Sequence, residues 1–109
     1  MSKFEAVLLF IPDLSNPIIN KEEKIFLKNI EDKKGKVISS EDWGLKDLSF
    51  NIDNYKKAFY KFYQIEMVGS NIKDLKNILT QNEQILRYLF VKVEEHQTLP
   101  TKIINNEEK

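Results

Sequence analysis

The stretch at residues 58–67 reads Ala-Phe-Tyr-Lys-Phe-Tyr-Gln-Ile-Glu-Met and is the strongest strand pattern in this chain of 109 residues. Aromatic residues, which favour a pleated and half-buried surface, recur along it. Successive side chains of a strand point to opposite faces of the sheet. The segment therefore predicts a strand whose two faces decide which residues enter the core.

The residues before this strand predict its hairpin partner. Residues 36–52 form a strand-rich stretch in which Leu48, Phe50 and Ile52 alternate with polar residues. Gly44 lies in the middle of the stretch, where a glycine indicates a bend or a bulge and not an end. Residues 53–57 are polar except for one tyrosine and are predicted to form the turn. Together the two strands would make a long hairpin.

Two further strands are predicted near the ends of the chain. In residues 3–11 both faces become apolar after Glu5, which is typical of a central strand. One face carries Phe4, Ala6, Leu8 and Phe10, and Pro12-Asp13 ends the strand. Residues 85–93, Ile-Leu-Arg-Tyr-Leu-Phe-Val-Lys-Val, form the last strand, and their pattern leaves open which face is buried.

Helices are predicted between these strands. Ser15 or Asn16 can cap the first, Pro17 suits its first turn and Gly35 is its predicted stop. Its apolar stripe is Ile19, Phe26 and Ile30. Ser70 or Asn71 is predicted to cap the second helix, whose apolar stripe is Ile72, Leu75, Ile78 and Leu79.

The element order is thus β-α-β-β-α-β, an α+β chain of the ferredoxin-like type. Right-handed crossovers would place both helices on one face of a four-stranded antiparallel sheet and leave the other face open. We expect one domain at residues 1–94 and a flexible polar tail at residues 95–109. This fold serves many functions and does not decide among them.

Composition excludes several classes of function. Basic and acidic residues balance at 17 each, and cysteine is absent, so no disulfide or thiol chemistry is available. No apolar run is long enough for a membrane span, and the N-terminus lacks a signal-peptide pattern, so the predicted location is cytoplasmic. The single histidine, His96, is expected to be solvated in the tail. We therefore predict no catalytic set, metal, cofactor or small-molecule substrate.

An apolar patch is predicted on the open face of the sheet. If Ile65 and Met67 lie beneath the helices, Tyr60 and Phe62 face the other way, beside Val7 and Leu9. Val7, Leu9, Tyr60 and Phe62 are therefore the predicted protein-partner surface, because an exposed apolar patch implies a partner. The alternative is a reversed parity, with these residues in the core, because one bulge inverts the faces of a strand.

Basic residues on strand segments are candidates for phosphate contact. Arg87, the only arginine, offers a planar fork for phosphate, or else is an ordinary solvated side chain. Lys3, Lys46 and Lys92 lie on or near strand segments that could be neighbours. The neutral total charge argues mildly against a protein that binds nucleic acid by itself.

Five short segments, in this order and spacing, resemble the bacterial ribosomal protein S six family over residues 3 to about 93. The Asp-Trp-Gly and Leu-Arg-Tyr-Leu parts are the most specific. The segments are Phe4-Glu5, Pro12-Asp13-Leu14, Glu41-Asp42-Trp43-Gly44, Leu48-Ser49-Phe50-Asn51-Ile52 and Leu86-Arg87-Tyr88-Leu89.

The resemblance implies a structural protein of the small (30S) ribosomal subunit that binds the central domain of 16S rRNA together with ribosomal protein S eighteen. By position it implies RNA contacts at Lys3, Lys46, Arg87 and Lys92. Asp47 stands where the family usually has a basic residue and would repel phosphate beside Lys46. Trp43-Gly44 would set the bend. The alternative is a free-standing single-stranded RNA binder of the RNA-recognition type, which stacks bases on its sheet.

Overall fold

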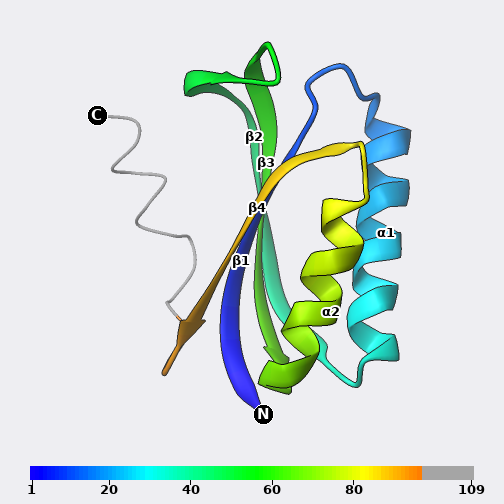
Figure 1. Ribbon diagram of the computed structural model, residues 1–109, viewed down its shortest axis with the longest axis vertical. Helices are drawn as coiled ribbons and strands as arrows, with labels where there is room; N and C mark the ends of the chain where they lie inside the picture. Colours follow the sequence, from blue (N-terminus) through cyan, green and yellow to red (C-terminus); the bar gives the residue numbers. More distant parts are fainter. Residues whose placement is uncertain (97–109) are drawn as a thin grey trace.

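The computed structural model describes residues 1–96 of the chain and arranges them as one antiparallel sheet with two helices on one face (Figure 1). The sheet order is β2-β3-β1-β4. The predicted ferredoxin-like architecture is confirmed. Neither helix of residues 1–96 is long and apolar enough to cross a bilayer. The elements are β1 (Ser2–Phe10), α1 (Asn16–Asp32), β2 (Lys36–Ile52), β3 (Tyr55–Met67), α2 (Gly69–Thr80) and β4 (Ile85–Val93).

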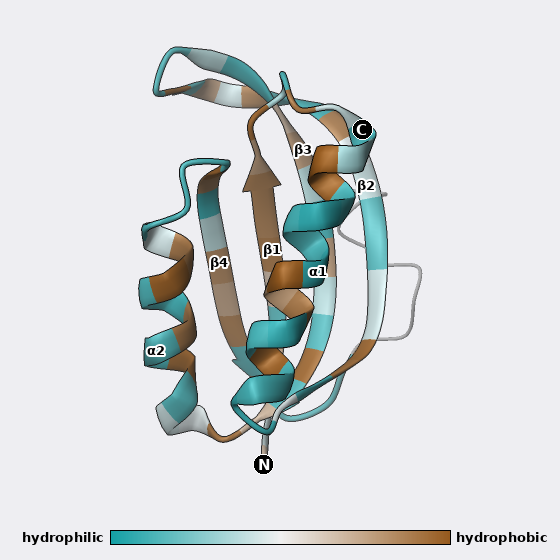
Figure 2. Ribbon diagram, turned by 90° about the vertical axis from the view of Figure 1, so that its right-hand side faces the viewer, coloured by the Kyte–Doolittle hydropathy of each residue, from teal (hydrophilic) through white to brown (hydrophobic). Residues whose placement is uncertain are grey.

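The central strand β1 supplies the middle of the core. Phe4, Ala6, Leu8 and Phe10 are buried beneath the helices, as their alternation predicted, and β1 is apolar along most of its length (Figure 2). Burial of this apolar surface is the main favourable contribution to folding. The residues that pack with them are Phe26, Ile30, Tyr63, Ile65, Met67, Ile72, Leu75 and Leu79.

Helix α1 ends before Gly35, as predicted, but the residue that takes the left-handed conformation at its end is Lys34 and not the glycine. Lys34 adopts the left-handed conformation, with φ 63°. Its N–H donates to the carbonyl of Glu31 at 2.8 Å, and the N–H of Gly35 donates to that of Ile30 at 2.9 Å. This is a Schellman motif whose left-handed position is a lysine. Glycine is needed at 35 for space, because a Cβ there would lie 2.7 Å from Cβ of Met67.

The hairpin turn is shorter than the sequence predicted. Asp53 and Asn54 alone form it, with φ 49° and 71°, and Ile52 pairs with Tyr55. Two residues with positive φ match the twist of the strands they connect, and Asp and Asn tolerate that conformation. Strand β3 therefore begins before residue 58, and the predicted turn at 53–57 is wrong at its C-terminal end.

The predicted cap of α2 is also wrong. The helix begins at Gly69 after Val68, and neither Ser70 nor Asn71 is its N-cap. The Asn71 side chain instead donates Nδ2–H to the carbonyl of Lys33 at 3.0 Å. This bond satisfies a backbone carbonyl at the end of α1, which would otherwise lack an intrahelical partner.

A hydrogen bond from the core holds α1 against the sheet. Tyr63 is fully buried, its ring packs on Phe26, and its hydroxyl donates to Oε2 of Glu23 at 2.7 Å. Burial, and then the bond to Glu23, raises the pKa of Tyr63 far above that of a free tyrosine. The hydroxyl therefore stays protonated above the pH at which a free tyrosine ionises.

Substitutions at Lys34 and Gly35, which lie just after α1, should change stability in opposite directions. Lys34→Gly should raise the free energy of unfolding by about 0.5–1 kcal/mol, because it relieves a left-handed lysine. Gly35→Ala should lower it by about 1–3 kcal/mol, because the added methyl group collides with Met67 and Ile30. Urea denaturation of both variants measures the difference. Equal effects at the two positions would contradict this account.

The raised pKa of Tyr63 predicts that the difference in free energy of unfolding between the wild type and Tyr63→Phe depends on pH. At neutral pH Tyr63→Phe should lower the free energy of unfolding by about 1.5 kcal/mol, through loss of the bond to Glu23. Above the ordinary tyrosine pKa of about 10, position 63 of the wild type ionises only in the unfolded chain. The free energy of unfolding of the wild type then falls with rising pH, whereas that of the variant has no tyrosine contribution at position 63. The gap between the two free energies of unfolding should therefore narrow. A difference that stays constant from pH 8 to pH 11 would contradict this assignment.

Candidate interface on the open face

The helix-free face of the sheet carries the predicted partner residues. Val7 pairs with Phe62 and Leu89, and Leu9 pairs with Tyr60 and Arg87. All of these residues have the parity opposite to the buried residues of β1. The reversed parity that the sequence left open does not occur. Val7, Leu9, Tyr60 and Phe62 are therefore adjacent on the face away from the helices.

The exposure expected for Phe62 is wrong, because Trp43 covers it. Phe62 is only 2% exposed. The ring centroids of Trp43 and Phe62 are 5.2 Å apart with planes 11° from parallel, and Trp43 also stacks at 6.4 Å on Tyr60. Phe62 is thus the floor of the patch, and Trp43 takes its place at the surface.

Trp43 lies at a bulge in β2 and projects from this face, like Glu41 two residues before it. Asp42 pairs with Lys61 and Gly44 with Tyr60, so Trp43 is the extra residue between them. Gly44 has φ 77°, and its N–H donates to Oδ1 of Asp42 at 2.8 Å. The prediction that Trp43-Gly44 sets the bend is confirmed. On the same face the indole Nε1–H of Trp43 donates to Oε1 of Glu41 at 3.1 Å.

These residues line an apolar groove of about 380 Å³, which we call the Trp43 groove. Leu89 and Val91 extend its apolar surface along β4, with 59% and 46% of their surface exposed. Leu89 and Val91 were not predicted from the sequence as part of the partner surface. The charged Arg87 could have indicated them, because it has the same parity on β4 and is expected to be exposed. The groove is lined by Val7, Leu9, Trp43, Tyr60, Arg87, Tyr88 and Leu89.

The four predicted RNA-binding residues are not gathered in one place. Arg87 is exposed on the β4 side of Tyr60, and Lys46 lies with Tyr60 in a neighbouring hollow on the β2 side. Lys3 and Lys92 lie at the opposite end of β1. Lys3 pairs with Glu95 at 3.4 Å, and Lys92 lies in register with the core residue Phe4, on the parity of the helix-bearing face.

The charge of Asp47, which was expected to weaken an RNA contact at Lys46, has a partner. Lys57 lies 3.6 Å from its carboxylate across the hairpin. Both side chains are more than half exposed, so the pair contributes little to stability. It does offset the negative charge that stands beside Lys46.

The polar end of the open face contains His96, which is not solvated as expected. Its side chain is 13% exposed, and Nδ1 lies 3.6 Å from Oε2 of Glu5. The same carboxylate oxygen accepts a hydrogen bond from Nε2 of buried Gln64 at 3.1 Å. Within residues 1–96 neither ring nitrogen of His96 has a hydrogen-bond partner. Exposed Glu95 thus pairs with Lys3 of β1 and His96 lies against Glu5 of β1, whereas the rest of the predicted tail lies outside the described residues.

The different positions of Phe62 and Leu89 predict different responses to truncation. Phe62→Ala should lower the free energy of unfolding by about 3 kcal/mol, because it leaves a cavity beneath Trp43. Leu89→Ala, at an exposed position, should change it by less than about 0.5 kcal/mol. Chemical denaturation measures both. A small effect at Phe62 would show that the residue is not the floor of the groove.

Comparison with known proteins gives a consistent family. Residues 3–92 match the family model described as ribosomal protein S6. The chain is 33% identical over 107 residues to the small ribosomal subunit protein bS6 of Rickettsia felis, covering 98% of this chain and 88% of that protein. It is 31% identical over 104 residues to the protein of the same name from Zymomonas mobilis subsp. mobilis, covering 95% and 84%.

A solved structure is similar in fold. The crystal structure of 30S ribosomal protein S6 from Thermotoga maritima matches with a TM-score of 0.79, covering 98% of this chain and 94% of that chain. The sequence identity in this match is 18%, so it supports the fold alone.

Proposed function

The chain belongs to the ribosomal protein S6 family, and from this premise we propose that it binds 16S rRNA jointly with a neighbouring protein, ribosomal protein S eighteen. The family consists of structural proteins of the small ribosomal subunit, so the role of the chain is structural and not enzymatic. The proposed place of action is the cytoplasmic ribosome.

The observation that carries the proposal of a protein neighbour is the Trp43 groove. Its floor, Phe62, is fully packed, while Leu89 beside it is 59% exposed. Apolar side chains that protrude around a rigid aromatic floor are typical of the centre of a protein–protein interface. A neighbour that covered Leu89 and Val91 would remove this apolar surface from water.

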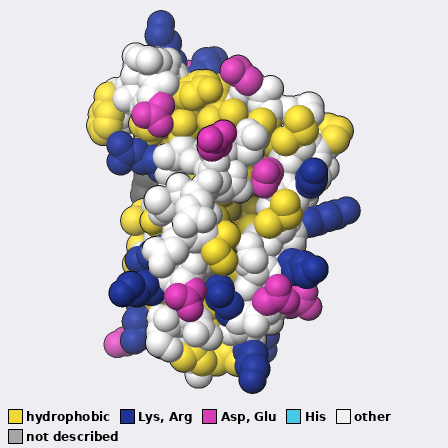
Figure 3. All heavy atoms as spheres, turned by 45° about the vertical axis from the view of Figure 1, so that its right-hand side comes forward, with side chains coloured by type: hydrophobic (Ala, Val, Ile, Leu, Met, Phe, Trp, Pro, Cys, Tyr) yellow, Lys and Arg dark blue, Asp and Glu magenta, His cyan; other side chains and the backbone are white. Residues whose placement is uncertain are grey.

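The charge distribution supports joint binding of RNA. Affinity for RNA depends largely on lysine and arginine contacts with phosphate, and this chain has equal numbers of basic and acidic residues. On the helix-bearing side the two signs are interspersed (Figure 3). The neighbour would therefore supply much of the positive charge of the pair.

Arg87 and Lys46 are the RNA contacts favoured by their position. Lys46 lies on the β2 side of Tyr60 and Arg87 on its β4 side. RNA could therefore contact both residues at the borders of a neighbour seated in the groove. Lys3 and Lys92, at the far end of β1, would form a separate and weaker contact, because Lys3 is already paired with Glu95.

A second candidate function has one observation in its favour. Trp43 and Tyr60 stack on the helix-free face, and RNA-recognition domains bind single-stranded bases on aromatic side chains at that place in the same fold. In this alternative the chain would bind RNA alone, and the apolar residues of β4 would border the bases.

A single substitution in the groove should separate the two functions. Leu89→Asp should weaken binding of the neighbour by about 30-fold or more, because it places a charge in an apolar contact. RNA binding by the isolated chain should be weak before and after the change. Titration calorimetry with the purified neighbour, and filter binding with a central-domain 16S rRNA fragment, measure the two affinities.

Ile25→Asp is the matched control, because Ile25 is an exposed apolar residue on α1, away from the groove. It should leave both affinities unchanged. Strong RNA binding by the isolated chain that is lost on Leu89→Asp would contradict joint binding and support the second candidate.

A further inference from the structure

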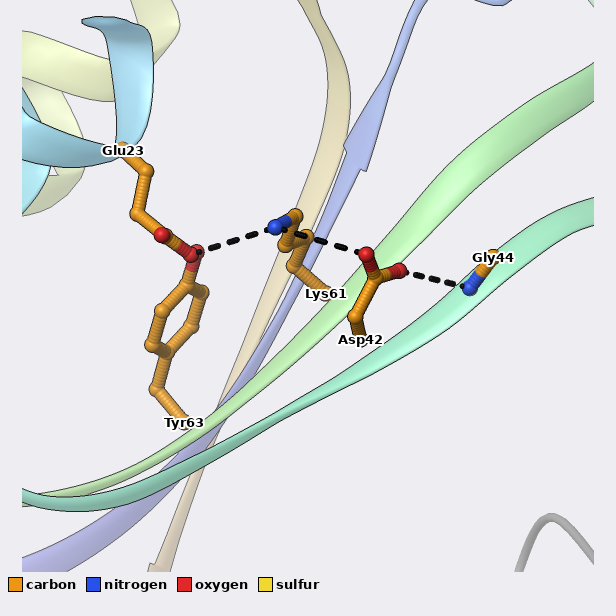
Figure 4. Close-up of polar contacts among 5 residues, drawn as sticks. All are labelled: Glu23, Asp42, Gly44, Lys61 and Tyr63. Atoms are coloured by element: carbon orange, nitrogen blue, oxygen red, sulfur yellow. Dashed lines mark hydrogen bonds and ion pairs between the residues drawn. The ribbon is translucent and has the colours of Figure 1, made fainter. Parts of the chain in front are cut away.

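A chain of polar contacts runs from α1 across the helix-bearing face of the sheet to the bulge (Figure 4). Glu23 of α1 accepts the Tyr63 hydroxyl hydrogen bond and lies 3.5 Å from Nζ of Lys61. Lys61 lies in turn 3.6 Å from Oδ2 of Asp42. The other oxygen of Asp42 accepts the N–H of Gly44.

Lys61 is the buried member of its ion pair with Asp42. Its side chain is 12% exposed, whereas that of Asp42 is 62% exposed. A buried ammonium group requires charged or polar partners, and Glu23 and Asp42 supply them. The Lys61 ammonium group thus holds the Asp42 carboxylate, and Glu23, hydrogen-bonded to the buried Tyr63, holds Lys61.

We propose that Lys61 and Asp42 are positioning residues for the Trp43 groove: their ion pair on the helix-bearing face fixes the backbone of the bulge from which Trp43 projects on the other face. The inference rests on the proposed function, because it assigns a role to residues behind the surface that a neighbour would occupy.

The argument depends on the geometry of the bulge. Trp43 is the extra residue of the bulge and has no partner residue in β3. Its indole Nε1–H donates to Oε1 of Glu41 at 3.1 Å, which orients the ring, while the left-handed Gly44 and its hydrogen bond to Asp42 fix the backbone from which the ring projects. Without its ion pair to Lys61, the exposed Asp42 carboxylate would hold the Gly44 N–H less firmly. Trp43 would then spend less time stacked on Phe62.

Trp43 is the only tryptophan of the chain, so its fluorescence reports this orientation directly. Lys61→Met should shift its emission to longer wavelength and increase its quenching by acrylamide. The same substitution should weaken binding of the neighbour by about 3- to 10-fold. Lys61→Arg, which keeps the charge, should restore the emission, the quenching and the affinity.

Asp42→Ala is the second variant, and its exposed position keeps the test valid if Lys61→Met does not fold. It should expose Trp43 in the same way. Lys36→Met is the matched control, because Lys36 forms an ion pair of 3.6 Å with Glu66 between the same two strands, at a distance from the bulge. It should change neither fluorescence nor affinity.

The outcomes separate this inference from the proposed function. Unchanged emission and quenching in Lys61→Met and Asp42→Ala would overturn the inference, even if both variants lost stability. If these variants expose Trp43 but bind the neighbour with unchanged affinity, Trp43 positioning is supported and the groove is not the binding surface. If only Trp43→Ala weakens binding, the groove binds the neighbour and the positioning role of Lys61 is overturned.

Discussion

Trp43 lies flat against Phe62 at a bulge in β2, and its indole Nε1–H donates to Glu41 on the same face. This one unpaired residue determines the character of the open face. Without it the aromatic ring of Phe62 would be exposed beside Val7. With it, Phe62 joins the interior and a broader indole ring is presented on a rigid floor. A rigid aromatic surface loses little conformational entropy when a partner covers it.

The two faces of the sheet are linked by the same local structure. On the helix-bearing face, Lys61 connects α1 to Asp42, and on the open face, Trp43 stacks over Phe62. Only backbone atoms separate these contacts. A charged group behind a binding surface can therefore set the shape of that surface without touching the partner. The apolar strand β1 holds the sheet in place around them.

The sequence predicted those parts that depend on local periodicity. Alternation in β1 identified its buried face, and the order of elements gave the fold. The end of α1 and the hairpin turn were missed in detail, because Lys34, Asp53 and Asn54 adopt left-handed conformations that their residue types permit but do not require. The prediction of which residues face the open side was right, but the predicted exposure of Phe62 was wrong, because Trp43, 19 positions away in the chain, stacks over it.

Contacts between distant segments explain the other differences, and they bear on how the molecule works. His96 was expected to be solvated, yet antiparallel pairing of β1 with β4 brings the end of the described chain back over Glu5. The open face is therefore divided: Glu5, Gln64 and His96 form a polar end, and the Trp43 groove forms an apolar end. Under the proposed function, a neutral protein with such a divided face would bind its protein neighbour first. Phosphate contact at Arg87 would then be a property of the pair, since one arginine beside an apolar groove neutralises few phosphates alone.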